Sequence, residues 1–83
     1  MSIEQLANVV GMLGTITVVA AYVLLQTGKL ASDSLSFNLL NLLGAVLLLL
    51  SLLVHFNLAS LVIEVFWIGA SLYGLWRIYR VKP

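Results

Sequence analysis

Three long apolar stretches, at residues 6–25, 35–54 and 58–79, constrain this chain more than any other feature of its sequence. Each is roughly 20 residues long, and a helix of that length matches the thickness of about 30 Å of the hydrocarbon core of a bilayer. Backbone groups in lipid must be satisfied within the segment, so we expect three membrane-spanning helices. They should cover residues 3–26, 34–55 and 58–80 of one all-α, three-helix membrane bundle, residues 1–83.

The composition excludes a water-soluble domain. Of the 83 residues, 63% are hydrophobic and 8% are charged, whereas soluble domains carry roughly 25% charged residues. A net charge of +1 implies no nucleic-acid partner. With no cysteine, one histidine and no Gly-rich phosphate loop, the sequence offers neither a metal site nor a catalytic constellation. We therefore expect no enzyme, no metal and no cofactor.

The breaks between the stretches carry helix-capping signals. Ser2 with Gln5 three residues later predicts a capping box. Gly28 suits the position just after a helix, and Asn57 is a natural N-cap for the third helix. The second helix can be capped by Ser32, Asp33 or Ser34. Because the loops are short, neighbouring helices should be antiparallel.

All four basic residues fall on one side of the predicted bundle, which holds the first loop and the C-terminus. They are Lys29, Arg77, Arg80 and Lys82. The positive-inside rule then predicts an outer N-terminus and a cytoplasmic C-terminus in the plasma membrane, which in a bacterium is the inner membrane. Aromatic residues typical of an interfacial belt lie near the same side, namely Tyr73, Trp76 and Tyr79. The arginines and Lys82 should contact anionic lipid.

Glu64 is the most informative residue within the spans. It lies six residues into the third predicted helix, about 9–10 Å below the outer end of that helix. Burying an ionisable group is costly and desolvation disfavours its charged form, so we expect a protonated or hydrogen-bonded carboxyl. Either this group binds a proton or a solute in a water-filled pathway, or it reaches the outer interface or hydrogen-bonds across a helix contact.

Other polar residues extend this site by helical spacing. Ser60, Glu64, Trp67, Ser71 and Gly74 recur at i, i+4, i+7, i+11 and i+14, which is one helix face. This face should point away from lipid. Trp67 could stack on a ligand or pack as a bulky plug, and the two roles are equally consistent with its position.

The second predicted helix carries Asn38 and Asn41 on one face with Ser34 and Ala45. Both asparagines could line a polar pathway that Glu64 enters from the outer end. They could equally hydrogen-bond between helices, which is the common role of Asn in membrane bundles. His55, at the outer end of this helix, is expected to be a solvated loop residue.

Small residues at helical spacing predict close contacts between helices. The candidates are Gly11, Gly14, Thr15, Gly44, Ala70 and Gly74.

The first predicted helix ends in Tyr22-Val23-Leu24-Leu25-Gln26-Thr27-Gly28-Lys29. This segment is similar to the Pro-Gln motif and following basic residue of the semiSWEET branch of the SWEET and PQ-loop superfamily. Asp33-Ser34-Leu35 resembles the Val-Ser that opens the second helix of that family. Gly44 and Glu64 fall where the family has a glycine and a pocket asparagine. The resemblance covers about residues 8–79.

The chain also departs from that pattern. No proline precedes Gln26, and Leu48 occupies the place of the pocket tryptophan. With Leu40-Asn41-Leu42-Leu43-Gly44, the sequence looks more like an uncharacterised bacterial three-helix sister family. Sugar transport is therefore not carried over.

The resemblance implies a parallel homodimer, and three helices alone enclose no sizeable cavity. Our leading hypothesis is a transporter-like protein for a small polar or cationic solute, with possible proton coupling. Glu64, Trp67, Asn41, Ser71 and Asn38 would form its pathway, and Gln26 with Tyr22 its inner gate. The alternatives are a non-transporting subunit or regulator of a larger membrane complex and, less favoured, a holin-like pore former.

Overall fold

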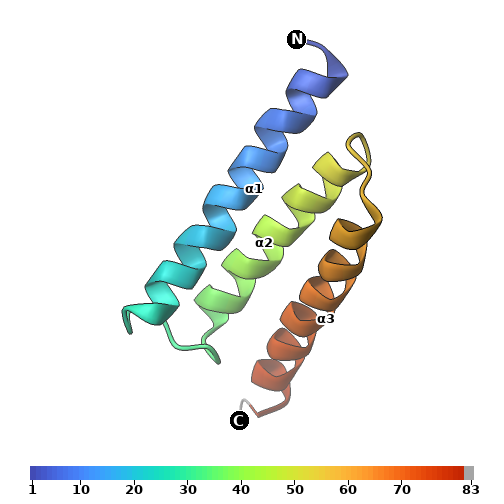
Figure 1. The fold of residues 1–83 in the computed structure, drawn as a ribbon. Coiled ribbons are helices and arrows are strands. Elements are labelled where there is room, and N and C mark those ends of the chain that lie inside the picture. Colours follow the sequence, from blue (N-terminus) through green and yellow to red (C-terminus); the bar gives the residue numbers. More distant parts are fainter. Residues whose placement is uncertain (82–83) are drawn as a thin grey trace.

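The computed structural model describes residues 1–81, which form three helices and no strand. The helices are α1 (Ile3–Gln26), α2 (Leu35–Leu52) and α3 (Leu58–Val81), each antiparallel to the next (Figure 1). All three are long and apolar enough to cross a membrane. The longest dimension of the molecule, 47 Å, is close to the full thickness of a bilayer with its headgroups, about 40–45 Å. Lys82, one of the predicted lipid contacts, lies outside the described residues.

The predicted signals at both ends of α1 are confirmed. The Ser2 hydroxyl accepts a hydrogen bond from the Gln5 backbone N–H at 3.1 Å, and Gln5 Oε1 accepts one from the Ser2 N–H at 2.9 Å. These two bonds complete the capping box. At the other end, Gly28 has a φ of 78° and donates to the Leu25 carbonyl at 3.1 Å. A positive φ is strained for other residues, so glycine allows the chain to leave the helix here.

The first turns of α2 and α3 are capped in the same manner. Ser34 is the residue that caps α2, because its hydroxyl accepts a hydrogen bond from the Phe37 N–H at 3.1 Å. Asn57 caps α3 as predicted, with Oδ1 accepting from the Ser60 N–H at 3.0 Å.

α2 ends at Leu52, three residues before the predicted limit of 55. The N–H groups of Val54 and His55 both donate to the carbonyl of Ser51, at 3.1 and 3.0 Å. Two donors on one carbonyl tighten the chain into a turn. Leu53 and Val54 are as apolar as the helix itself, so hydropathy alone could not locate this end.

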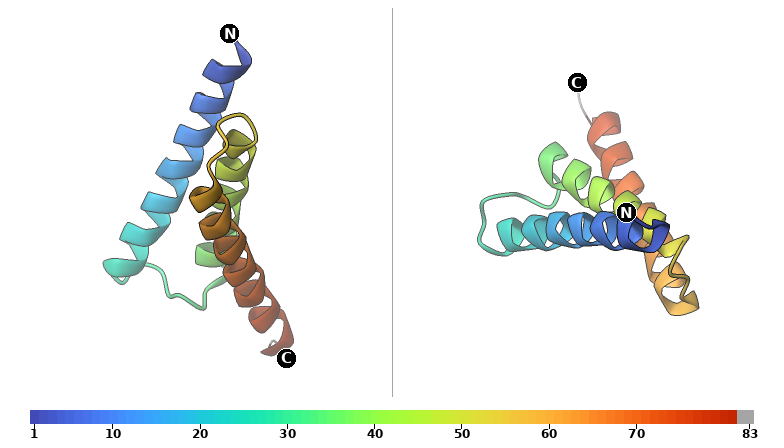
Figure 2. Two further views of the ribbon diagram at one scale, coloured as in Figure 1. Left: turned by 45° about the vertical axis from the view of Figure 1, so that its right-hand side comes forward. Right: turned by 90° about the horizontal axis from the view of Figure 1, so that it is seen from above.

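α2 lies between the other two helices. It contacts both α1 and α3, whereas α1 and α3 do not contact each other. Figure 2 shows α1 and α3 diverging from one another on either side of the bundle. The arrangement is an open layer with a groove between α1 and α3, floored by α2.

The α1–α2 contact brings two backbones together at glycines. A methyl group on Gly14 would lie 2.8 Å from the carbonyl oxygen of Gly44 and 3.0 Å from the backbone nitrogen of Leu48. Gly11 faces the side chain of Ser51 in the same contact. The predicted close-approach residues Gly11, Gly14 and Gly44 therefore meet in one interface.

The lower end of α3 carries an aromatic and basic cluster. The rings of Tyr73 and Trp76 are 5.9 Å apart between centroids, and the Arg80 guanidinium lies 4.7 Å from the centroid of Trp76. This cation–π contact holds a cation beside an aromatic group, a combination suited to a membrane–water boundary.

We expect Gly14→Ala to destabilise the protein, because its methyl group would meet backbone atoms that cannot rotate away. Overpacking of this kind costs about 1–3 kcal/mol. The free energy of unfolding in mixed detergent micelles should fall by that amount. Gly69→Ala is the matched control, since a methyl group there meets nothing within 4 Å. An equal loss in both variants would contradict the close α1–α2 contact.

Candidate functional site

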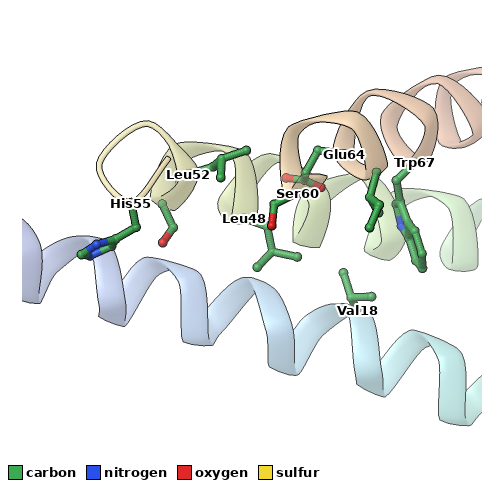
Figure 3. Close-up of a pocket in the computed structure, with 9 residues that line it drawn as sticks. Val18, Leu48, Leu52, His55, Ser60, Glu64 and Trp67 are labelled. Carbon is green, nitrogen blue, oxygen red and sulfur yellow. The ribbon is translucent and has the colours of Figure 1, made fainter. Parts of the chain in front are cut away.

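A pocket of about 340 Å³ lies in the groove between α1 and α3 (Figure 3). All three helices contribute to it: α1 provides one residue, α2 and the start of its following loop four, and α3 four. The lining residues are Val18, Leu48, Ser51, Leu52, His55, Ser60, Ile63, Glu64 and Trp67. Four of these residues are aliphatic and Trp67 is aromatic, and one carboxyl group is set among them.

Glu64 is the most unusual polar group of this pocket. Its side chain is only 8% exposed, and Oε2 is buried with no hydrogen-bond partner among residues 1–81. Buried polar atoms in folded proteins almost always have a partner, so each exception calls for a specific explanation. Because Glu64 lines the pocket, a solute, a proton or a water there could supply the missing interaction.

Asn41 joins the polar residues of α3 that the sequence placed on one face. Its Oδ1 accepts a hydrogen bond from the Trp67 indole N–H at 2.9 Å. Its Nδ2 donates to the hydroxyl of Ser71 at 3.0 Å, and Ser71 is 1% exposed. The structure therefore brings Asn41, Trp67 and Ser71 together as a three-residue cluster between α2 and α3. The asparagine acts as a link between helices, and in doing so it fixes one wall of the pocket.

Asn38 has a different role from Asn41. Its Nδ2 donates to the backbone carbonyls of Ser32 and Ser34, at 3.0 and 2.9 Å. Its Oδ1 lies directly against Gly74, where any Cβ would collide with it. Asn38 thus holds the α1–α2 loop and seats α3, and its amide group is occupied by these contacts.

His55 is an exposed residue of the loop between α2 and α3, as the sequence suggested, and it also lines the pocket. Its Nε2 lies 3.5 Å from the backbone carbonyl of Glu4 at the start of α1. Figure 3 shows the imidazole at the end of the pocket opposite Trp67. The spacing of Leu48, Ser51, Leu52 and His55 at i, i+3, i+4 and i+7 was the available signal that this histidine shares the pocket face.

The predicted gate residues lie at the other end of α1. Gln26 Nε2 and the Tyr22 hydroxyl are 3.2 Å apart and hydrogen-bonded, and both side chains are exposed. Tyr22 lies four residues after Val18 and eleven after Gly11. This helical spacing puts it on the side of α1 that borders the groove. Tyr22 and Gln26 do not contact Glu64.

The opposite side of α2 carries an aliphatic stripe over residues 39–50. Leu39, Leu43, Val46 and Leu50 follow one another at i, i+4, i+7 and i+11, and each is 40–53% exposed. This stripe is suited to lipid. Polar groups of the spans gather instead on the groove side, so the two sides of the bundle have different environments.

A second pocket, of about 460 Å³, is lined by residues of α2 and α3 alone. It shares Ile63 and Trp67 with the first pocket. The other residues that line it are Asn41, Val62, Phe66 and Ala70. Trp67, held by Asn41, therefore borders both pockets.

The remaining small residues stand apart from the helix contacts of the single chain. Thr15 is exposed and its hydroxyl bonds to the Gly11 carbonyl of its own helix at 2.9 Å. Ala70 is also exposed. Over residues 1–81 no group of three or more His, Asp or Glu side chains could hold a metal ion.

A family model matches residues 7–82, which is nearly the whole chain, and the family it represents is uncharacterised. No curated protein and no solved structure matches the sequence. The resemblance to the SWEET and PQ-loop superfamily therefore remains a prediction.

We expect Asn41→Ala to weaken the α2–α3 contact, because it removes two hydrogen bonds and leaves the Trp67 indole N–H unpaired. Interhelical bonds of this kind contribute about 0.6–2 kcal/mol in membranes. The free energy of unfolding should fall by that amount, and the fluorescence of Trp67 should change in a Trp76→Phe background. Asn8→Ala, at an exposed position of α1, is the control and should change neither quantity.

Proposed function

The chain belongs to this uncharacterised family, and we propose that it is a transporter-like membrane protein that binds or moves a small polar or cationic solute. The observation that carries the proposal is the unpartnered carboxyl of Glu64, 8% exposed and set in a pocket of about 340 Å³. Burying an ionisable group at membrane depth costs free energy, so its presence there indicates a function. Glu64 would bind the solute or a proton, and Trp67 would form the inner wall of its pocket.

The distribution of polar groups supports a path along the groove. His55 and Glu64 lie toward one end, Trp67 and Asn41 toward the middle, and the Tyr22–Gln26 pair lies at the other end. A solute that enters beside His55 would meet Glu64 first and the indole next. Trp67 borders both pockets, so a change in its rotamer would alter both.

We propose that the His55 end faces outward. The described cations Lys29, Arg77 and Arg80 all lie toward the opposite end of the bundle. The positive-inside rule favours placing that end in the cytoplasm, and the aromatic pair of Tyr73 and Trp76 beside Arg80 suits the same interface. The membrane would be the plasma membrane, and in a bacterium the inner membrane.

A second copy of the chain would close the groove. α1 and α3 do not contact each other, so one chain leaves the pocket open along its length. The aliphatic stripe of α2 is suited to lipid, whereas the groove side carries the carboxyl and the tyrosine. Two chains in the same orientation, related by a two-fold axis, could bury both grooves against each other.

A non-transporting subunit of a larger complex is the alternative. It is favoured by exposed small residues on α3, since Gly69 meets nothing within 4 Å and Ala70 is exposed. Such residues let another helix approach closely. A larger partner that copurifies in fixed stoichiometry from native membranes would favour this role over the homodimer.

We expect Glu64→Gln to abolish pH-dependent solute uptake into vesicles that contain the full chain, because the amide has nearly the shape of the carboxyl but cannot exchange a proton. The rate of uptake should be measured across a range of pH for both proteins. Glu4→Gln, at an exposed position, should keep the wild-type profile. Unchanged uptake in the Glu64 variant would remove this residue from the mechanism.

The absence of cysteine makes the dimer directly testable with single-cysteine variants. Thr15→Cys and Ile63→Cys border the groove, and we expect both to form cross-linked dimers in membranes treated with a bismaleimide. Leu43→Cys lies on the aliphatic stripe and should stay monomeric. Cross-linking through Leu43→Cys alone would show that two copies meet on the other side of the bundle.

A further inference from the structure

We infer that the Glu64 pocket takes a small organic monocation, an amine or ammonium compound with a compact apolar body. This inference rests on the proposed solute-binding role of the pocket and narrows the chemical class of its ligand. It is carried by the charge, the composition and the size of the lining.

The charge of the lining has one sign. Glu64 is the only Asp or Glu that lines the pocket, and no Lys or Arg joins it. The cations Lys29, Arg77 and Arg80 lie toward the far end of the described chain. A carboxylate enclosed by aliphatic walls is costly unless a positive charge accompanies it. An anionic or zwitterionic solute would bring a second negative group, and the only basic side chain of the lining is the exposed His55 at the end of the pocket opposite Trp67.

The ligand set does not suit a divalent metal ion. The pocket offers one carboxylate and one imidazole, from Glu64 and His55, with the hydroxyls of Ser51 and Ser60. Zinc takes four strong ligands and calcium takes six to eight oxygens. A single carboxylate is matched by a single ammonium group, which needs only hydrogen-bond acceptors and charge.

The rest of the wall matches the body of such a cation. Leu48, Leu52 and Val18 are aliphatic, and the Trp67 indole closes one end of the pocket (Figure 3). An indole attracts cations to its face, and quaternary ammonium groups are recognised in this manner. The Trp67 Nε1–H donates a hydrogen bond of 2.9 Å to Asn41 Oδ1. This bond holds the ring, so the aromatic surface is already in place before a ligand arrives.

The size of the pocket limits the ligand. A volume of about 340 Å³ is near the lower end of ligand pockets, which range over roughly 300–1,000 Å³. A small amine fits this volume, and a polyhydroxylated solute would turn part of its hydroxyl groups toward Val18, Leu48 and Leu52, which offer no hydrogen-bond partner.

The test uses the full chain in lipid nanodiscs, in a Trp76→Phe background so that Trp67 is the only tryptophan. Its fluorescence is titrated with propylammonium, with 1-propanol as the neutral analogue and with propionate as the anionic one. We expect saturable binding of propylammonium, tighter than either analogue by at least about tenfold, as a charge-assisted hydrogen bond implies. Glu64→Gln should abolish this preference, and Glu4→Gln should retain it.

Three results would overturn the inference. They are equal binding of propylammonium and 1-propanol, a preference that survives in Glu64→Gln, and saturation by Zn²⁺ or Mg²⁺ at lower concentration than by propylammonium. Saturable binding of 1-propanol or propionate that is at least as tight as that of propylammonium, and that Ser60→Leu blocks, would overturn the choice of a cation while keeping the proposed solute pocket. The absence of any response to all three solutes would overturn both.

Discussion

The hydrogen bonds of the Asn41 side chain determine how α3 sits on the rest of the molecule. In lipid, apolar contacts between helices compete with equally apolar acyl chains, so directional bonds and close backbone contacts decide which faces meet. The α1–α2 pair has backbone contact at Gly14 and Gly44. The α2–α3 pair has instead the amide of Asn41, which bonds Trp67 at 2.9 Å and Ser71 at 3.0 Å. These two bonds fix the rotation of α3 about its own axis and thereby bring Glu64 to the groove.

That rotation also explains why Glu64 stands alone. Asn41 and Ser71 satisfy each other, and Trp67 is satisfied by the same amide. Glu64, two turns from Ser71 on the same face, reaches past this cluster into the pocket. Its Oε2 has no partner among the described residues, because Asn41 directs its two hydrogen bonds to Trp67 and Ser71 instead. A polar cluster complete in itself thus leaves one carboxyl available for something outside the chain.

Much of the fold could be predicted from the sequence, because apolar stretches long enough to cross a membrane favour a simple pattern of helices. The length of each apolar stretch, the capping side chains of Ser2 and Asn57 and the glycine at position 28 gave three helices and most of their ends. The end of α2 at Leu52 could not be read, because apolar residues continue into the turn. Hydropathy describes a helix in relation to lipid and contains no signal for a tight turn among leucines.

The residues of the candidate site could be predicted from the sequence, but most of their contacts with one another could not. Helical spacing placed Glu64, Trp67 and Ser71 on one face and Asn41 on another helix. It could not show that Asn41 bonds to both Trp67 and Ser71, that Asn38 is occupied by the loop, or that His55 lines the same pocket. Each of these depends on the rotation of one helix against another. Two of the bundle's helices never touch, so each rotation is set by α2 alone. The α1–α2 contact is thus made through backbone atoms at Gly14 and Gly44, whereas the rotation of α3 depends on side-chain bonds from Asn41.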